Sequence, residues 1–242
     1  MQNTIETKEE KYHALVQSFK THVFSDEKSW VNPYSIDGFD SYCKEKGVNK
    51  CEVLNPWNLW QGNLNADILV IGQDWGNKSE LENLIKTSKE KSNNTNNKII
   101  EFIKILGYEI SQPYKTDNQT KNRLFFTNAI LGIRTGAKSG SLTSSQKKCH
   151  KETWFYLYSL IQIIQPKCII AIGGDTYEII KYIFPLQNYN TFPEVVENNG
   201  KHNKILGSDF YAVYHPQSWS KHRTKEEQLS DWKEIAQLMK NK

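Results

Sequence analysis

The sequence predicts an α/β fold in which helices cover both faces of a central four-stranded parallel sheet. Four short apolar runs, at residues 68–71, 123–127, 167–172 and 210–214, alternate with segments that have helical periodicity. Parallel strands are buried on both faces, so they read as continuous apolar runs. Strands that alternate with helices in this way predict three layers, helix over sheet over helix.

Each apolar run ends in glycine or in a polar side chain. The first is followed by Gly-Gln-Asp ending at Asp74, the second by Asn128, the third by a glycine pair beginning at Gly173, and the fourth by His215. In open α/β sheets, ligands bind at the carboxyl ends of the strands. We therefore expect these four positions to lie along one edge of the sheet and to form the functional site.

Residues 1–65 predict a helix followed by an aromatic-rich arm packed on the core. Residues 6–24 place Leu15 and Phe19 on one face of an amphipathic helix. The rest of this segment is irregular and rich in Asn, Pro, Gly and aromatic residues. The main domain is expected over residues 66–242, from the first apolar run onward.

Between the first two strands the sequence predicts mostly polar loops. Residues 78–97 are rich in Lys, Asn and Ser and predict a loop, as do residues 111–122. Residues 99–106 predict a helix that ends at Gly107.

A Gly-, Ser- and Lys-rich loop is expected over residues 132–145. The backbone amides of such a loop can hold phosphate, and its cations add attraction. An ordinary solvated loop explains the composition equally well. The cations in or near this loop are Arg134, Lys138, Lys147 and Lys148.

The last third of the chain predicts three helices. Residues 149–164 form a helix whose core face holds Trp154, Leu157, Tyr158 and Ile161. Asp175 is suited to cap a helix over residues 176–184. A long connection follows over residues 185–209, and the capping box that starts at Thr224 begins the final helix.

Composition excludes several classes of protein. The 31 basic and 27 acidic residues give a net charge of +4, which permits a polyanionic partner without requiring one. No apolar run approaches the roughly 18 residues of a membrane span, and residues 1–10 lack the apolar stretch of a signal peptide. A cytoplasmic protein with no membrane association is therefore expected. The four cysteines form no Cys-x-x-Cys pair, so no metal is expected.

Taken in order, the strand ends resemble the motifs of the uracil-DNA glycosylase superfamily. Residues 72–74 (Gly-Gln-Asp) resemble its water-activating loop, and residues 126–128 (Phe-Thr-Asn) resemble its pyrimidine-reading strand end. Residues 166–174 resemble its glycine turn, and residues 215–220 (His-Pro-Gln-Ser-Trp-Ser) its leucine-loop motif. The resemblance covers residues 66–240 and implies a four-stranded parallel sheet between helix layers.

The resemblance implies a role for each matched residue. Asp74 matches the acid that orients a water and stabilises positive charge on the sugar. Asn128 matches the side chain that hydrogen-bonds the base, and His215 the one that stabilises negative charge on the departing base. The other base-binding positions are Gln73, Trp75 and Gly76. The positions expected to contact DNA are Gly173, Gly174, Ser218, Trp219 and Arg223, together with Lys138 of the Gly-, Ser- and Lys-rich loop.

These residue types suit the cleavage of a nucleoside bond. The target base must be flipped out of the duplex or taken from a single strand, and Trp219 is suited to fill the vacated stack. Bond breakage leaves a cation-like sugar and an anionic base, which a carboxylate and a neutral histidine would stabilise. The amide of Asn128 carries both donors and an acceptor, so it fits uracil or cytosine and does not fix the base.

The sequence departs from the family pattern at three places. Trp75-Gly76 stands where the best-known branch has Pro-Tyr, whose tyrosine excludes a C5 methyl group, so a C5-modified pyrimidine is a possible substrate. The family's base-stacking aromatic is missing from the Asn-rich residues 93–97, and Trp75 or Trp60 would have to replace it. Cys149 falls near one cysteine ligand of the cluster-binding branches, but Gly132 occupies another, so no cofactor is expected.

The sequence thus predicts a monofunctional DNA glycosylase, acting as a monomer on single- or double-stranded DNA. Its substrate would be uracil, which would fit a repair enzyme, or a C5-modified pyrimidine such as modified phage cytosine, which would fit a role in phage defence. One alternative is a catalytically silent member that binds DNA or a protein through the same cleft. Another is a small-nucleotide-binding protein that uses the glycine turn at Gly173.

Overall fold

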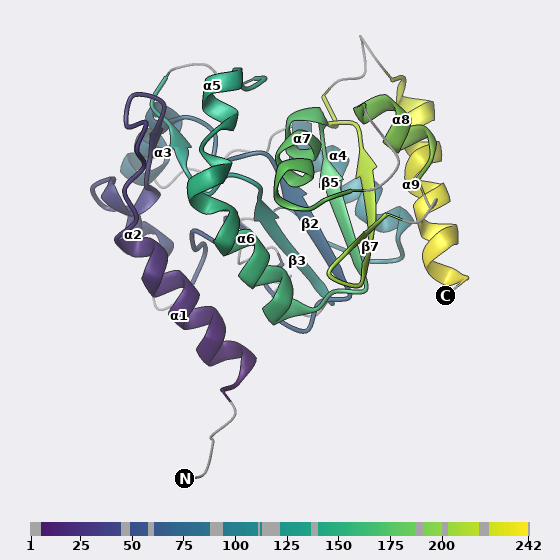
Figure 1. Cartoon of the computed structure of the whole chain (residues 1–242), viewed down its shortest axis with the longest axis horizontal. Coiled ribbons are helices and arrows are strands. Elements are labelled where there is room, and N and C mark those ends of the chain that lie inside the picture. Colours follow the sequence, from purple (N-terminus) through teal and green to yellow (C-terminus); the bar gives the residue numbers. More distant parts are fainter. Residues whose placement is uncertain are drawn as a thin grey trace.

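The computed structural model has three layers, with helices in front of and behind a central sheet (Figure 1). It describes residues 6–44, 49–57, 61–87, 94–110, 112, 122–136, 140–186, 191–199, 203–217 and 223–241. This architecture confirms the predicted α/β class and the helix–sheet–helix layering.

The central sheet has five strands in the order β3-β2-β5-β7-β6. Four run parallel and confirm the predicted strands: β2 (Ile68–Gly72), β3 (Leu124–Asn128), β5 (Cys168–Ile172) and β7 (Ser208–Val213). The fifth, β6 (Lys204–Ile205), pairs antiparallel with β7 at the edge and extends the predicted four-stranded sheet. A strand of two residues gives no periodic pattern, so the sequence did not indicate it.

Alternate side chains of each strand enter two separate cores. On one face, Leu69 and Ile71 pack with α1 (Lys8–Lys20), α6 (His150–Ile164), α7 (Gly174–Ile183) and α8 (Phe192–Glu197). On the other face, Ile68 and Val70 pack with α4 (Asn94–Ile105) and α9 (Lys225–Lys240). The strands are therefore covered on both sides, as their unbroken apolar runs require.

The helix ends follow local capping chemistry where the sequence carries it. Thr7 and Thr224 each form a capping box with the glutamate three residues later, and these boxes begin α1 and α9. The capping box predicted at Thr224 is therefore confirmed. Helix α1 ends at Lys20, four residues before the predicted end.

Residues 78–97 were predicted to form a loop, and the structure corrects this. Helix α3 (Lys78–Thr87) occupies the first half, and α4 already begins at Asn94. Only Leu81 of α3 is fully buried. A helix that buries so little needs few apolar residues, so its polar composition resembled that of a loop. Gly107, with φ of 89°, follows the end of α4 as predicted.

Two predictions for the last third of the chain are wrong. Trp154 is 45% exposed on α6, whereas Leu157, Leu160 and Ile161 form its buried face. Asp175 lies in the first turn of α7 and does not cap it, because Gly173 is the N-cap residue. The connection over residues 185–209 also contains α8 and β6.

The arm contains short elements that pack beside the main sheet. They are β1 (Trp30–Val31), the 3-10 helix η1 (Pro33–Ser35) and α2 (Phe39–Cys43). Strand β1 pairs with β4 (Ile133–Arg134), which is followed by α5 (Ser144–Lys147). A disulfide, which the sequence analysis did not anticipate, joins Cys43 to Cys51. The arm shares the core of the main domain, since Trp30, Val53 and Leu54 belong to the larger cluster.

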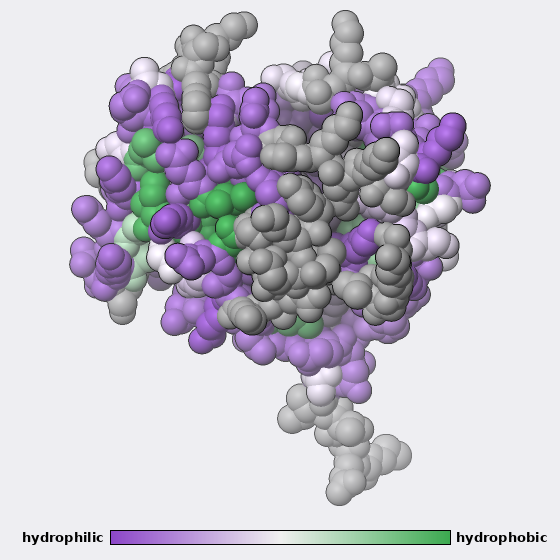
Figure 2. All heavy atoms as spheres, turned by 180° about the vertical axis from the view of Figure 1, so that it is seen from behind, coloured by the Kyte–Doolittle hydropathy of each residue, from purple (hydrophilic) through white to green (hydrophobic). Residues whose placement is uncertain are grey.

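In the part of the chain that the structure describes, the surface seen from behind is mainly hydrophilic, with small apolar patches (Figure 2). Among the described residues, no helix combines the length and the apolarity needed to cross a membrane.

Candidate functional site

The carboxyl ends of the four parallel strands bring the predicted site together along one edge of the sheet. Gly72, at the end of β2, is in register with Asn128 at the end of β3. Strand β5 lies between β2 and β7, so Gly173 stands between the segments that carry Asp74 and His215. Neighbouring strands lie about 4.8 Å apart, and two such spacings leave roughly 10 Å between the ends of β2 and β7.

Asn128 presents a buried amide that has no hydrogen-bond partner among the described residues. The residue is 1% exposed, and both its Oδ1 and its Nδ2 lack a partner. Gly72 makes room for this amide, because a Cβ at position 72 would lie 2.7 Å from Asn128 Oδ1. Buried amides are almost always hydrogen-bonded, so this one is suited to a polar ligand or to water.

Gln61 is a second buried amide near the end of β3, which the sequence analysis missed. It is fully buried, and neither amide atom has a partner within the described part of the chain. Its backbone carbonyl accepts a hydrogen bond from Phe126, two residues before Asn128. No sequence signal marks it, since it belongs to an irregular segment that pairs with the edge of β3.

The Asp74 carboxylate is buried and held by several donors at once. Its side chain is 3% exposed. Oδ1 accepts from the Gly76 backbone at 2.6 Å and from Arg134 Nη2 at 3.3 Å. Oδ2 accepts from Gln73 Nε2 at 3.0 Å and lies 3.2 Å from Arg134 Nε. Burial raises the pKa of Asp74 above its ordinary value, and the charge of Arg134 and these hydrogen bonds oppose that rise.

Arg134 is the main site residue that sequence reasoning placed wrongly. It was expected in a loop suited to phosphate, but it lies in β4 with its side chain 6% exposed. Its backbone N–H donates to the Gly76 carbonyl, and Nη1 donates to the Gly140 carbonyl, both at 3.0 Å. Strand β4 is held by antiparallel pairing with β1, in which Arg134 lies opposite Trp30. The guanidinium therefore faces Asp74 from a rigid element.

Gly76 and Trp75 have structural tasks in the turn after β2. Gly76 has a φ of 83°, a conformation that favours glycine. The Trp75 indole N–H donates to the Val53 carbonyl at 3.2 Å, and its ring meets Phe39 edge-on at 5.4 Å. The structure thus places the Trp75 ring against the arm.

His215 lies at the rim of the strand ends and is held in one tautomer. The Gln217 backbone N–H donates to His215 Nδ1 at 3.2 Å, so a neutral ring carries its proton on Nε2. A Cβ on Gly173 would lie 3.5 Å from that of His215. The residue is exposed, but nearby protein displaces part of the hydration of its ring, which lowers the pKa of His215. The charge of Lys98 lowers this pKa further.

The loop after His215 is tied to α4. Lys98 Nζ donates to the Pro216 carbonyl at 3.0 Å, and Gln217 Nε2 donates to Thr95 Oγ1 at 2.6 Å. Helix α4 therefore positions the histidine loop, a role that the sequence analysis did not assign to it.

Other residues expected to contact DNA make internal contacts. Arg223 forms a two-pronged ion pair with Asp231, at 2.6 Å and 3.1 Å. Gly174 begins α7, and a Cβ there would lie 3.4 Å from the Phe192 ring. Four of the predicted residues lie outside the described residues: Trp60, Lys138, Ser218 and Trp219.

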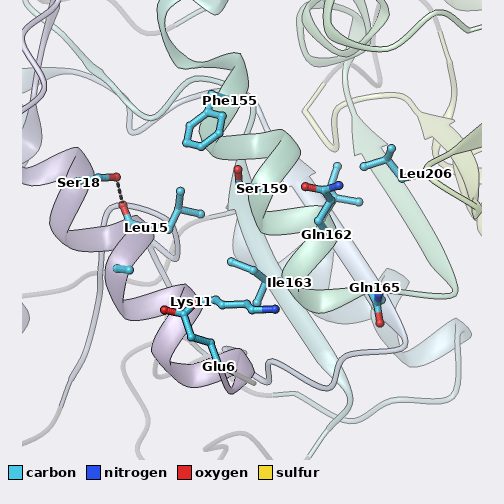
Figure 3. A pocket seen from close by; sticks show the side chains of 12 residues that line it. Glu6, Lys11, Leu15, Ser18, Phe155, Ser159, Gln162, Ile163, Gln165 and Leu206 are labelled. Carbon is cyan, nitrogen blue, oxygen red and sulfur yellow. Dashed lines mark hydrogen bonds between the residues drawn. The ribbon is translucent and has the colours of Figure 1, made fainter. Parts of the chain in front are cut away.

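A groove of about 790 Å³ runs between α1 and α6, where Leu15, Phe155 and Gln165 line it (Figure 3). Gln165 precedes β5, so the groove reaches the amino end of that strand and is separate from the Asp74 site. Within the described part of the chain, no cluster of His, Cys, Asp or Glu is suited to hold a metal ion.

Comparison with known families agrees with this arrangement. The sequence model of the Uracil DNA glycosylase superfamily matches residues 59–239, about three quarters of the chain. A comparison with curated proteins gives no match. The family match spans all four strand ends that carry the site. The chain therefore belongs to the uracil-DNA glycosylase superfamily.

Proposed function

We propose that this protein is a monofunctional DNA glycosylase that hydrolyses the bond between a flipped-out pyrimidine and its deoxyribose, and leaves an abasic site. The observation that carries the proposal is the arrangement of three groups along one sheet edge. These are the buried Asp74 carboxylate, the unpartnered Asn128 amide and the His215 imidazole with its Nε2 proton. Membership of the superfamily supports an N-glycosidic bond as the target.

Each group answers one need of the reaction. The negative charge of Asp74 stabilises the cation-like sugar, and the Nε2–H of His215 stabilises the anionic base. The Asn128 amide receives the polar edge of the base and thereby satisfies its own buried donors and acceptor. Uracil and C5-modified pyrimidines both suit an amide of this kind, and modified phage cytosine would give the enzyme a defence role.

A second function is favoured by a specific observation. Both oxygens of Asp74 are already engaged by Arg134, Gln73 and Gly76. A carboxylate held in this way could be purely structural, in which case the protein would bind DNA without cleaving it.

A glycosylase assay on defined oligonucleotides separates the two functions. Single- and double-stranded substrates would carry uracil, thymine opposite guanine, hydroxymethylcytosine or glucosylated hydroxymethylcytosine, and alkali would cleave any abasic sites. Release of one of these bases by the wild-type protein, and not by His215→Ala, supports the enzyme. Binding of the same oligonucleotides without release of any base supports the silent binder.

Gly72→Ala tests the role of Asn128 in the proposed reaction. The added Cβ would lie 2.7 Å from Asn128 Oδ1, so the amide must move. A displacement of about 1 Å at a reacting group lowers the rate by on the order of 10²-fold. We expect a loss of this size in kcat/KM, measured beside a thermal melt.

Gly136→Ala is the matched control for this variant, because no atom of the described residues lies within 4 Å of a Cβ at position 136. Its activity should remain that of the wild type. Full activity of a folded Gly72→Ala variant would show that the position of the Asn128 amide is unimportant.

A further inference from the structure

The ion pair between Asp74 and Arg134 joins a site residue to one that no motif identifies. The two side chains are 3% and 6% exposed, so the pair is withdrawn from water. The two residues are 60 positions apart in the sequence, and strand β3 lies between them. Nothing in the chemistry of base hydrolysis demands an arginine here, so its presence calls for a physical reason.

Burial of a carboxylate without a cation favours its neutral form. A lone carboxyl group in a dry site takes up a proton at a pH well above its ordinary range. A neutral Asp74 would lack the negative charge that the proposed mechanism requires. A guanidinium within hydrogen-bond distance opposes this tendency, because its positive charge stabilises the ionised carboxylate.

The geometry shows that Arg134 is fixed before it meets the carboxylate. Its backbone is held by the Gly76 carbonyl and by pairing with Trp30, and its Nη1 by the Gly140 carbonyl. The Gly76 N–H, in turn, donates to Asp74 Oδ1 at 2.6 Å. The turn, the strand and the carboxylate thus form one closed set of contacts.

We propose that Arg134 is a positioning residue for the reaction of this site: its buried guanidinium keeps the Asp74 carboxylate ionised and holds it at the end of β2. The inference rests on the proposed glycosylase function for its effect on rate. Its physical content, the ionisation and position of Asp74, can be measured without any substrate.

The other titratable groups near Asp74 cannot take over this role. Burial raises the pKa of the Cys149 thiol at the start of α6, and the negative charges of Glu152 and Asp74 raise it further. Glu80 of α3 places Oε2 3.8 Å from the position of a Cβ on Gly76. Neither group is positively charged, so Arg134 supplies the compensating charge within the described surroundings.

Two readouts test the proposal on the full chain. The first is the midpoint of the Asp74 carboxyl titration, followed by carbon NMR on protein labelled at aspartate and assigned by its loss in Asp74→Asn. The second is the acidic limb of the pH profile of kcat/KM. In Arg134→Met both should move upward by about one to three pH units, the range by which a close opposite charge depresses a carboxyl pKa.

The control variants separate charge from fold. Arg134→Lys keeps a cation but loses the fork, so it should restore much of the NMR midpoint while kcat stays reduced. Arg134→Lys also keeps the proposal testable if Arg134→Met does not fold. Arg123→Met is the matched control, because Arg123 Nε lies 3.1 Å from Asp67 Oδ2. This ion pair lies at the amino ends of β2 and β3, away from the proposed site at their carboxyl ends. This variant should move neither readout.

The outcomes distinguish this inference from the proposed function. An unchanged Asp74 midpoint in folded Arg134→Met overturns the role of Arg134 and leaves the glycosylase intact. If Arg134→Met raises the Asp74 midpoint but the wild-type protein releases no base from any substrate, the role of Arg134 is supported and the glycosylase function is rejected. A lower melting temperature with both readouts unmoved would show that the pair serves stability alone, which also overturns the proposal.

Discussion

Asp74→Asn is expected to abolish base release and to destabilise the fold, and a second substitution, Arg134→Met, is expected to restore stability without restoring activity. The first change leaves the guanidinium buried beside a neutral amide. Removal of one partner of a buried ion pair destabilises a protein by about 3–5 kcal/mol, because the remaining charge is unpaired. Replacement of both partners by neutral groups removes that penalty and is often close to neutral.

The rate should respond differently from the stability. Loss of a preorganised charge at the reacting centre lowers kcat by on the order of 10²–10³-fold or more. This loss should be the same in Asp74→Asn and in the double variant, since neither carries a carboxylate. Urea unfolding gives the stability, and single-turnover base release at saturating enzyme gives the rate.

Two results would contradict this account. Activity that returns together with stability in the double variant would show that Asp74 matters only for folding. A single Asp74→Asn variant as stable as the wild type would show that the ion pair is not buried in solution. Arg223 and Asp231 offer a comparison, since they form a similar fork at 2.6 Å and 3.1 Å away from the proposed chemistry.

The strand ends could be predicted because their signal is local. Four apolar runs, each followed by glycine or a polar residue, define both the sheet and the edge at which side chains converge. Asp74, Asn128 and His215 were therefore placed without any knowledge of long-range contacts. The antiparallel strand β6 is too short to leave such a pattern.

The partners of these residues could not be predicted, because they depend on contacts across the chain. Arg134 lies in a segment whose Gly, Ser and Lys content indicated a solvated loop, yet pairing with β1 draws it into the core. Trp75 looked like a base-stacking residue, but the arm supplies Phe39 and Val53 to hold its ring. In both cases the arm, which carried little sequence signal, decides where the side chain lies.

Gly76 illustrates how one residue can support two explanations. Its missing side chain suggested room for a C5 substituent on the base. Its φ of 83° gives a second reason for glycine, since any side chain there would strain the turn that donates to Asp74. Substitution of Gly76 would disturb the carboxylate as well as the pocket, so the choice of base is better tested with a series of substrates.

His215→Ala is expected to lower kcat by on the order of 10²–10³-fold, with little change in KM, because the Nε2 proton acts on charge that develops only in the transition state. The neutral tautomer is essential to this role. Protonation of Nδ1 would set its proton against the Gln217 N–H, which now donates to it at 3.2 Å. The loop would then have to move, so activity should fall as the imidazole becomes charged.

Lys98→Gln tests the control of this tautomer by charge. The positive charge of Lys98 lowers the pKa of His215, so its removal should raise that pKa and move the acidic limb of kcat to higher pH. Lys104→Gln is the control, because Lys104 is exposed and lies on the last turn of the same helix. An unmoved limb in Lys98→Gln would show that His215 does not govern the acidic side of the profile.

Arg134→Met and Lys98→Gln together show which group governs the acidic limb of the pH profile. Arg134→Met acts on Asp74 and Lys98→Gln acts on His215, and these residues follow different strands. If one group governs the limb, only one of the two variants moves it, and the double variant matches that single variant. If both groups must be in the correct state, each variant moves the limb and the double variant moves it further than either single variant. The proposed mechanism requires the second result, because an ionised carboxylate and a neutral imidazole act on opposite charges in the same transition state.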